Sequence, residues 1–489
     1  MSDKVLVIDE GTTSTRAMLF SRTGQCLDSE QAVIKTFFPA PGRVEQDARE
    51  IWEKTLACCQ AVIARSGGAR EIGAIGITNQ RETVVAWDSA TGEPLTRAII
   101  WQDRRTADRC AELKAAGKEP LVQARTGLLL DPYFSAAKMR WMIDHIDAVA
   151  DAGDRLMFGT IESWLCYKLT GGLHISDASN ASRTSLMALD GQDWDPEMLD
   201  LFGVPETALP AIVDSYGCYA KTQPGLFSVA LPICGMAGDQ QAATIGQARL
   251  TTGETKATFG TGAFILSNSG TAVPTSANRL LSTVLFQEND VRHYALEGSV
   301  FVAGSLIQWM RDGLGILQTA AETAQLAASV PDNGGVVIVP ALSGLGAPHW
   351  RPDARGLIDG LDFSTGSAHL ARAALESMAH QTYDLQTAFA ADGAAWTSFS
   401  IDGGMAANDW MAQDIADILD LPVERPAFLE TTALGAAMLA SCGIDLCVHL
   451  EEATNSMRGD VECFEPAMAA SARELRLEQW HEALHRVLD

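Results

Sequence analysis

The chain has 489 residues, of which 47% are hydrophobic and 20% are charged, a balance typical of a folded globular protein. A chain of this length is expected to form roughly two to four domains. The net charge of −26 and the lack of any run approaching ~18 apolar residues argue against nucleic-acid partners and membrane insertion.

The first predicted elements form a hairpin. Residues 4–8 are an apolar, β-prone run, and the nearby acids Asp3, Asp9 and Glu10 do not fit a signal peptide. A Gly/Thr turn over 11–14 and a second apolar run follow, so the hairpin tip would offer N–H groups and hydroxyls to phosphate oxygens. Asp9 is placed to hold Mg²⁺ through water. A purely structural turn is the alternative at this point.

A helix over 48–63 and a buried strand over 73–78 are predicted next. Arg81 and Glu82 follow that strand, at the edge where open α/β sheets bind their ligands. A guanidinium donor beside a carboxylate acceptor suits a neutral substrate that is rich in hydroxyl groups. The alternative is a surface ion pair at the end of a strand.

A helix is predicted over 135–145. Much further along the chain, Asp239 lies in the segment Gly238-Asp239-Gln240-Gln241, which directly precedes an alanine-rich, helix-like stretch. An aspartate at this point is either a helix N-cap or a general base that accepts a proton from an attacking hydroxyl. Both interpretations stay open from these residues alone.

A second predicted hairpin comes about 250 residues after the first, with a Gly/Thr turn over 260–262 between two apolar runs. The repetition predicts two related halves with a cleft between them and a boundary near Leu250, giving residues 1–249 and 250–489. Further helices are predicted over 299–312, 369–388 and 408–419. Strands that alternate with helices are typical of an α/β fold.

His481 and His485 match the zinc-protease spacing His-Glu-x-x-His. A solvated C-terminal helix explains the pair more simply, because only four residues follow for a third ligand.

Ten scattered cysteines without a Cys-x-x-Cys pair predict reduced thiols and a cytoplasmic location. No P-loop segment occurs.

The ordered motifs together are similar to those of the FGGY carbohydrate kinases, and the resemblance runs from Asp9 to about Ala440. The segments that carry it are Asp9–Arg16, Ile77–Thr83, Trp101–Thr106, Asp131–Ser135, Asn180–Thr184, Gly238–Gln241, Gly260–Gly262, Gly344–Pro348 and Asp402–Gly404.

The resemblance implies a two-lobed α/β fold of the actin/hexokinase type, built from duplicated RNase H-like units with an ATP cleft between the lobes. It implies transfer of the γ-phosphoryl group of Mg·ATP to a terminal hydroxyl of glycerol, giving sn-glycerol 3-phosphate. It also implies a homodimer or homotetramer. The alternatives are a kinase for another small polyol or ketose, such as erythritol or xylulose, and a non-catalytic, actin-like ATP-binding scaffold.

The resemblance also implies roles for matching positions. Asp239 would be the general base, and Mg²⁺ would bind near Asp9 with Asp239 close by. The residues implied around glycerol are Arg81, Glu82, Trp101, Tyr133, Asp239, Gln240 and Phe264. The residues implied around ATP are Thr12, Thr13, Ser14, Arg16, Thr261, Gly304, Gln308, Gly404 and Asn408. Glu10 stands where many family members that act on glycerol have glutamine, and we expect its side chain to face away from ATP.

Overall fold

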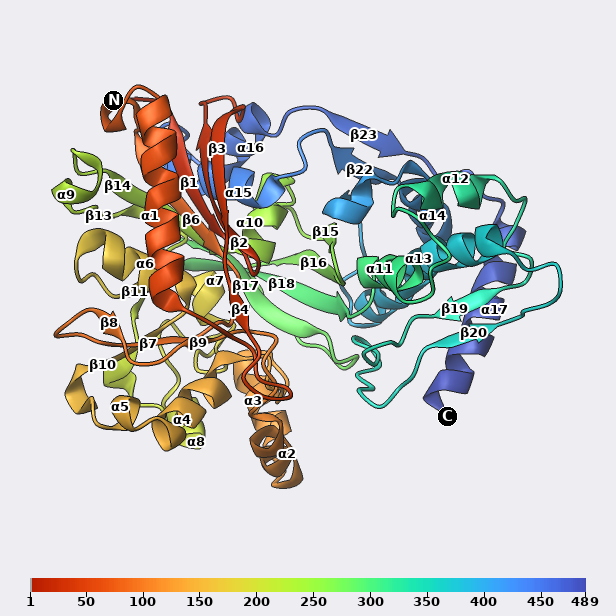
Figure 1. The fold of residues 1–489 in the computed structure, drawn as a ribbon, viewed down its shortest axis with the longest axis horizontal. Helices are drawn as coiled ribbons and strands as arrows, with labels where there is room; N and C mark the ends of the chain where they lie inside the picture. Colours follow the sequence, from red (N-terminus) through yellow and green to blue (C-terminus); the bar gives the residue numbers. More distant parts are fainter. Residues whose placement is uncertain (1) are drawn as a thin grey trace.

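Residues 2–489 are described by a computed structural model, which contains two large mixed sheets with helices packed around them (Figure 1). The first sheet has the order β13 (Tyr216–Lys221), β14 (Pro232–Gly238), β6 (Ala74–Asn79), β1 (Val5–Glu10), β2 (Ser14–Phe20), β3 (Cys26–Val33). The second has the order β17 (Leu281–Glu288), β18 (Val291–Val300), β16 (Ala263–Gly270), β15 (Glu254–Phe259), β21 (Ser398–Asp402), β22 (Val423–Pro426), β23 (Val461–Phe464).

The two sheets repeat one pattern of neighbours and directions. Strand β1 runs antiparallel to β2 and parallel to β6, while β14 runs parallel to β6 and antiparallel to β13. Strand β15 has the same relation to β16 and β21, and β22 runs parallel to β21 and antiparallel to β23. This repetition confirms the predicted duplicated α/β fold.

Both predicted hairpins are confirmed. Strands β1 and β2 pair through Glu10 and Thr15, which leaves residues 11–14 around the tip. Strands β15 and β16 pair through Phe259 and Ala263, which leaves residues 260–262 at the second tip.

Four predicted helices are confirmed and a fifth is partly wrong. Helices α1 (Ala48–Arg65), α4 (Ser135–His145), α13 (Ser367–Ala391) and α14 (Asp409–Leu419) lie where the sequence places them. The helix predicted over 299–312 begins only at Gly304, as α11 (Gly304–Asp312), because Ser299 pairs with Phe264 inside the second sheet. Pairing across the sheet overrides the local helical pattern there.

Shorter elements connect and cover the two sheets. The other helices include α2 (Ala107–Ala115), α3 (Glu119–Thr126), α6 (Ile161–Thr170), α7 (Ala178–Ala181), α8 (Pro196–Phe202), α9 (Pro224–Phe227), α10 (Asp239–Gly246), α12 (Glu322–Ala328), α15 (Thr431–Gly443), α16 (Leu450–Met457) and α17 (Ala470–Leu488).

Smaller sheets lie outside the two large ones. Two of them have three strands, in the orders β10 (Leu156–Gly159), β7 (Val85–Asp88), β8 (Glu93–Pro94) and β4 (Thr36–Phe37), β5 (Glu45–Gln46), β9 (Ala98–Ile99). Two have two strands each: β11 (Ile175–Asp177) with β12 (Ala211–Val213), and β19 (Val337–Val339) with β20 (Leu357–Asp359).

Helices α10 and α15 cross in direct backbone contact between the two sheets. A β-carbon at Gly435 would lie 1.8 Å from the Ala242 carbonyl oxygen, and one at Gly246 would lie 2.0 Å from the Thr431 carbonyl oxygen. Only glycine permits so close an approach. The crossing brings the start of α15 close to α10, the helix that begins with Asp239.

Helix α15 belongs to the last quarter of the chain but packs on the first sheet. It contacts β1, β6 and β14, and its side chains Leu434 and Met438 share a buried cluster with Val5 and Val7. The hydrophobic core of the first sheet is therefore completed by residues from the far end of the sequence.

Within residues 2–489, no helix is long and apolar enough to cross a membrane. All ten cysteines are free thiols, in agreement with the predicted lack of a disulfide framework.

Candidate active site

Asp239 follows β14 directly and is the first residue of α10. Gly238 occupies the N-cap position, so the N-cap alternative is wrong. The Asp239 Oδ1 lies 3.3 Å from Arg81 Nε, and 31% of the side chain is exposed. Burial raises the pKa of Asp239 to about 6, although Arg81 opposes the rise. The result is an accessible carboxylate that changes charge near neutral pH, as a general base requires.

Two arginines and two glutamates form a buried network beside Asp239. Arg81 Nη1 donates to Glu297 Oε2 at 2.6 Å, and Arg183 donates to Glu82 at 2.6 Å and to Glu297 at 2.9 Å. None of the four side chains is more than 2% exposed. The alternative of a surface ion pair for Arg81 and Glu82 is therefore wrong. The network joins the end of β6 to β18 of the second sheet.

Two members of this network, Arg183 and Glu297, are not among the site residues predicted from the sequence. Arg183 lies just after α7, within the motif Asn180–Thr184, and Glu297 lies in β18 among buried residues. A single acid in a buried strand does signal that a cationic partner lies nearby in the fold. Nothing local identifies that partner, because Arg81 is 216 positions away.

Three aromatic side chains from separate segments meet beside the network. The Trp101 ring centroid lies 5.8 Å from that of Tyr133 and 6.3 Å from that of Phe264, which belongs to β16 of the second sheet. Trp101 Nε1 also donates to Thr12 Oγ1 at 2.8 Å, so the aromatic group touches the first hairpin tip. An apolar wall of this kind suits the carbon chain of a small polyol.

The first hairpin presents polar groups and one strong ion pair. Thr13 is exposed, and Thr12, Ser14 and Arg16 are partly exposed. Arg16 Nη2 lies 2.5 Å from Asp9 Oδ2, and its other nitrogen pairs with Glu430 at the start of α15. The predicted metal ligand Asp9 is thus paired with a cation within its own hairpin.

The Glu10 side chain packs against helix α1. It is fully buried, and its Oε2 accepts from Thr55 of α1 at 3.3 Å. Burial raises the pKa of Glu10 to about 8. The expectation that its side chain faces away from ATP agrees with this contact.

The second hairpin tip docks on the start of α11. The Gly260 carbonyl accepts the Gly304 N–H at 2.9 Å, and the Thr261 carbonyl accepts the Ser305 N–H at 3.1 Å. Thr261 and Gln308 are exposed. These groups form one surface that backbone contacts hold in place, as nucleotide phosphates require.

Two further predicted ATP residues lie after β21. Gly404 is exposed and opens the short helical turn η4 (Gly404–Ala407). Asn408 caps α14 through the Met411 N–H and donates to Thr323 at 3.2 Å, so its side chain already serves the fold. Within residues 2–489, no hydrogen bond or ion pair links these two to Asp239.

Two buried lysines flank the predicted substrate residues. Lys256 of β15 donates to Gln240 Oε1 at 2.5 Å, and Lys138 of α4 donates to the carbonyls of Glu82 and Tyr133. Burial lowers the pKa of each lysine to about 8. Neither lysine is among the site residues predicted from the sequence.

Metal ligands do not gather into a closed site anywhere between residues 2 and 489, where no three His, Cys, Asp or Glu side chains are placed around one point. His481 and His485 lie on α17, where they face Asp384 and Asp489 respectively. Their separate partners agree with a solvated helix and give the zinc interpretation no support.

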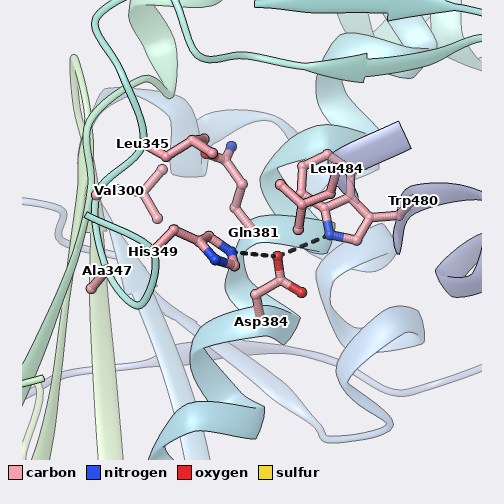
Figure 2. Close-up of a pocket in the computed structure, with 9 residues that line it drawn as sticks. Val300, Leu345, Ala347, His349, Gln381, Asp384, Trp480 and Leu484 are labelled. Atoms are coloured by element: carbon pink, nitrogen blue, oxygen red, sulfur yellow. Dashed lines mark hydrogen bonds and ion pairs between the residues drawn. The ribbon is translucent and has the colours of Figure 1, made fainter. Parts of the chain in front are cut away.

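A small cavity in the second half of the chain is not the substrate site. Its volume is about 10 Å³, enough for one water molecule at most. Figure 2 shows Asp384 at its centre, with His349 on one side and Trp480 on the other. Trp480 Nε1 donates to Asp384 Oδ2 at 2.9 Å, which ties α17 to α13.

Each of the two halves of the chain matches a domain of a known protein family. Residues 4–246 match the N-terminal domain of the FGGY family of carbohydrate kinases, and residues 255–444 match its C-terminal domain. The chain belongs to this family.

Individual FGGY kinases resemble the chain over nearly its whole length. It is 50% identical over 487 residues to the glycerol kinase of Rhodospirillum centenum, covering 99% of this chain and 97% of that one. The glycerol kinase of Rhodospirillum rubrum is 50% identical over 489 residues, with 99% and 98% covered. The crystal structure of Plasmodium falciparum glycerol kinase with ADP is 33% identical, with a TM-score of 0.93 and 99% and 98% covered. The xylulose kinase of Rhodospirillum rubrum is 26% identical, with a TM-score of 0.88 and 99% of both chains covered.

Proposed function

We propose that this FGGY kinase transfers the γ-phosphoryl group of ATP to a terminal hydroxyl of glycerol, giving sn-glycerol 3-phosphate and ADP. The observation that carries the proposal is the accessible Asp239 carboxylate beside Arg81 and a three-ring aromatic wall. Relatives that are 50% identical over almost the whole chain are glycerol kinases, which supports this substrate over a longer sugar.

Recognition of glycerol would rest on hydrogen bonds and shape, because the molecule is a neutral triol. Arg81 and Gln240 offer donors and Glu82 offers an acceptor. Tyr133 adds a phenol whose pKa is raised by burial, so it stays protonated and able to donate. Trp101 and Phe264 would cover the carbon chain and exclude water.

Asp239 would act as the general base. Its carboxylate accepts the proton of the attacking hydroxyl while that oxygen bonds to the γ-phosphorus, and the bond from the γ-phosphorus to the bridging oxygen of ADP breaks. Little other covalent work is needed from the protein, because phosphoryl transfer depends mainly on positioning and on charge stabilisation.

ATP would lie between the two hairpin tips. Thr12, Thr13, Ser14 and Arg16 would face its phosphates from the first sheet, and Thr261 would face them from the second. Gly304, Gln308, Gly404 and Asn408 would form the nucleoside site at the carboxyl ends of β15 and β21. The docking of Gly260 on Gly304 supports one continuous nucleotide surface.

The donor set suits Mg²⁺ that is carried by the nucleotide. Mg²⁺ needs only one or two carboxylates, since phosphates and waters complete its coordination. Asp9 and Asp239 would supply those carboxylates, and Arg16 would have to release part of its hold on Asp9. When bound, the ion would neutralise charge that develops on the phosphates.

Three further features complete the proposal. A boundary near Leu250 would separate residues 1–249, with the polyol site and first hairpin, from residues 250–489, with the second hairpin and nucleoside site. Ten free thiols support a cytoplasmic location. Assembly as a homodimer or homotetramer is carried over from the family resemblance.

A substrate panel tests the function. ADP release with Mg·ATP would be measured across glycerol, dihydroxyacetone, erythritol, xylulose, ribulose and gluconate at equal concentrations. We expect glycerol to give by far the highest kcat/KM. A preference for xylulose or erythritol would overturn the substrate, and silence on every acceptor with retained ATP binding would favour a non-catalytic scaffold.

A further inference from the structure

Lys256 is a fully buried cation in the middle of the second sheet. It lies in β15 opposite Ser400 of β21. Its Nζ donates to Gln240 Oε1 at 2.5 Å and to Thr258 Oγ1 at 2.8 Å. A strand of the second sheet therefore touches the second residue of α10, directly beside the proposed base Asp239.

The charges around Lys256 come from four elements. Asp402 of β21, Asp239 of α10 and Glu297 of β18 attract it, and Arg81 beyond β6 repels it. One oxygen of Asp402 accepts from Thr431, while the other is buried without any hydrogen-bond partner. A buried ammonium is expensive unless it is paired, so a packing role alone would be better served by an apolar residue.

The contact with Gln240 fixes the direction of an amide. A glutamine side chain has an acceptor oxygen at one corner and a donor NH₂ at the other. Because Lys256 can only donate, it holds the Gln240 oxygen and turns the NH₂ away from itself. Gln240 would then meet a polyol hydroxyl as a donor, which complements Glu82 as an acceptor.

We propose that Lys256 is a positioning residue for polyol binding: it orients Gln240 as a hydrogen-bond donor to the polyol. The inference deepens the proposed function and rests on it. It assigns the second sheet a part in polyol recognition as well as in nucleotide binding.

The test compares Lys256→Met with Lys138→Met. Both remove a buried ammonium, but Lys138 contacts backbone carbonyls and has no contact with Gln240 or Asp239. For Lys256→Met we expect the glycerol KM to rise about tenfold, since a charge-assisted hydrogen bond is lost. We also expect kcat to change much less than the glycerol KM, because the contact acts on binding of the polyol. The ATP KM should stay close to the parent value.

The variant Gln240→Leu shows whether Lys256 acts through that amide. In this background Lys256→Met should raise the glycerol KM no further, whereas any effect of Lys138→Met should persist. An unchanged glycerol KM in Lys256→Met, or a further rise in the double variant, would overturn the proposal. If Lys256→Met does not melt cooperatively, Lys256→Arg and Gln240→Leu decide instead. The arginine variant keeps a donor to the amide oxygen, so its glycerol KM should rise less than that of the leucine variant. An equal or larger rise in the arginine variant would overturn the proposal.

Failure of the proposed function has a separate signature. In that case the parent protein itself would phosphorylate no polyol, or would prefer another acceptor. Failure of the Lys256 inference leaves the parent's glycerol activity intact and shows only in the variants.

Discussion

Arg81 and Glu297 meet at 2.6 Å although 216 positions separate them in the chain. The same carboxylate also accepts from Arg183, which in turn holds Glu82. One acid of the second sheet therefore sets the positions of both polar residues that follow β6. The edge of the first sheet that carries Arg81 and Glu82 therefore depends on a strand from the other sheet for its geometry.

Replacing Glu297 with glutamine should be among the most damaging single changes outside the reacting groups. Two buried guanidinium groups would lose their shared counter-charge, so we expect the free energy of unfolding to fall by about 3–5 kcal/mol. Denaturant unfolding measures the change. The control Glu478→Gln, on the exposed side of α17, should leave stability unaltered. A matching loss in the control, or none in Glu297→Gln, would contradict the role of the network.

Asp239→Asn should abolish turnover and spare binding. The amide cannot accept the hydroxyl proton, so kcat should fall by about 10²–10⁴-fold. Single-turnover kinetics and calorimetric titration with ATP would separate the two effects. A variant with nearly full kcat would show that another group is the base.

The pH profile should report the titration of Asp239. Its pKa is raised to about 6 and its active form is the carboxylate, so kcat/KM should be constant above that pH. Below it, the rate should fall about tenfold per pH unit as the base becomes protonated. Melting curves recorded at each pH distinguish this loss from unfolding. A flat profile down to pH 4.5 with folded enzyme would be inconsistent with Asp239 as the base.

Glu10→Gln should stabilise the protein at neutral and alkaline pH. Burial raises the pKa of Glu10 from 4.5 to about 8, so the folded state holds a proton that the unfolded state releases. The stability linked to that proton is fully present below pH 4.5 and is lost as the pH rises through 8. Glutamine has no such loss.

Calorimetry should therefore find a higher Tm for Glu10→Gln at pH 8 and almost no difference near pH 4.5. The ATP KM should be unchanged, because Glu10 contacts α1 and not the hairpin tip. A Tm difference that does not vary with pH would contradict the raised pKa of buried Glu10. A much lower ATP KM would show that Glu10 acts on the nucleotide.

Gly304→Ala should weaken nucleotide binding selectively. The added methyl group would lie 2.6 Å from the Gly260 carbonyl oxygen, so the second hairpin tip must move. We expect the ATP KM to rise about tenfold, a typical overpacking penalty, with little change in the glycerol KM. Gly225→Ala is the matched control, since its β-carbon meets no atom within 4 Å. Equal ATP KM values for both variants would refute the coupling between Gly304 and the tip.

Local pattern predicted the elements better than it predicted their meeting points. The two hairpins and α4 could be located from apolar runs and turn residues, because those signals act over a few residues. The helix predicted over 299–312 is wrong in its first residues, because Ser299 pairs with Phe264 of the distant strand β16. Tertiary pairing of this kind leaves no trace in the local sequence.

The candidate site divides in the same way. The family motifs pointed to Arg81, Glu82 and Asp239, but the deep burial of the arginine and glutamate was not predictable from a polar pair at a strand end. Their partners Arg183 and Glu297 lie about 100 and 216 positions away, and only the fold brings them together. Roles at the nucleotide surface remain predictions drawn from the motifs.

The packing of α15 on β1, β6 and β14 has a consequence for folding of the chain during its synthesis on the ribosome. All strands of the first sheet have been synthesised once residue 238 has emerged. One apolar face of this sheet, however, is covered only when Leu434 and Met438 have been added. That face must stay exposed, or be shielded by a chaperone, while nearly 200 further residues are synthesised at about 5–20 residues per second. Truncated chains that end before α15 should therefore aggregate, whereas in the full chain α15 covers the apolar face of the first sheet.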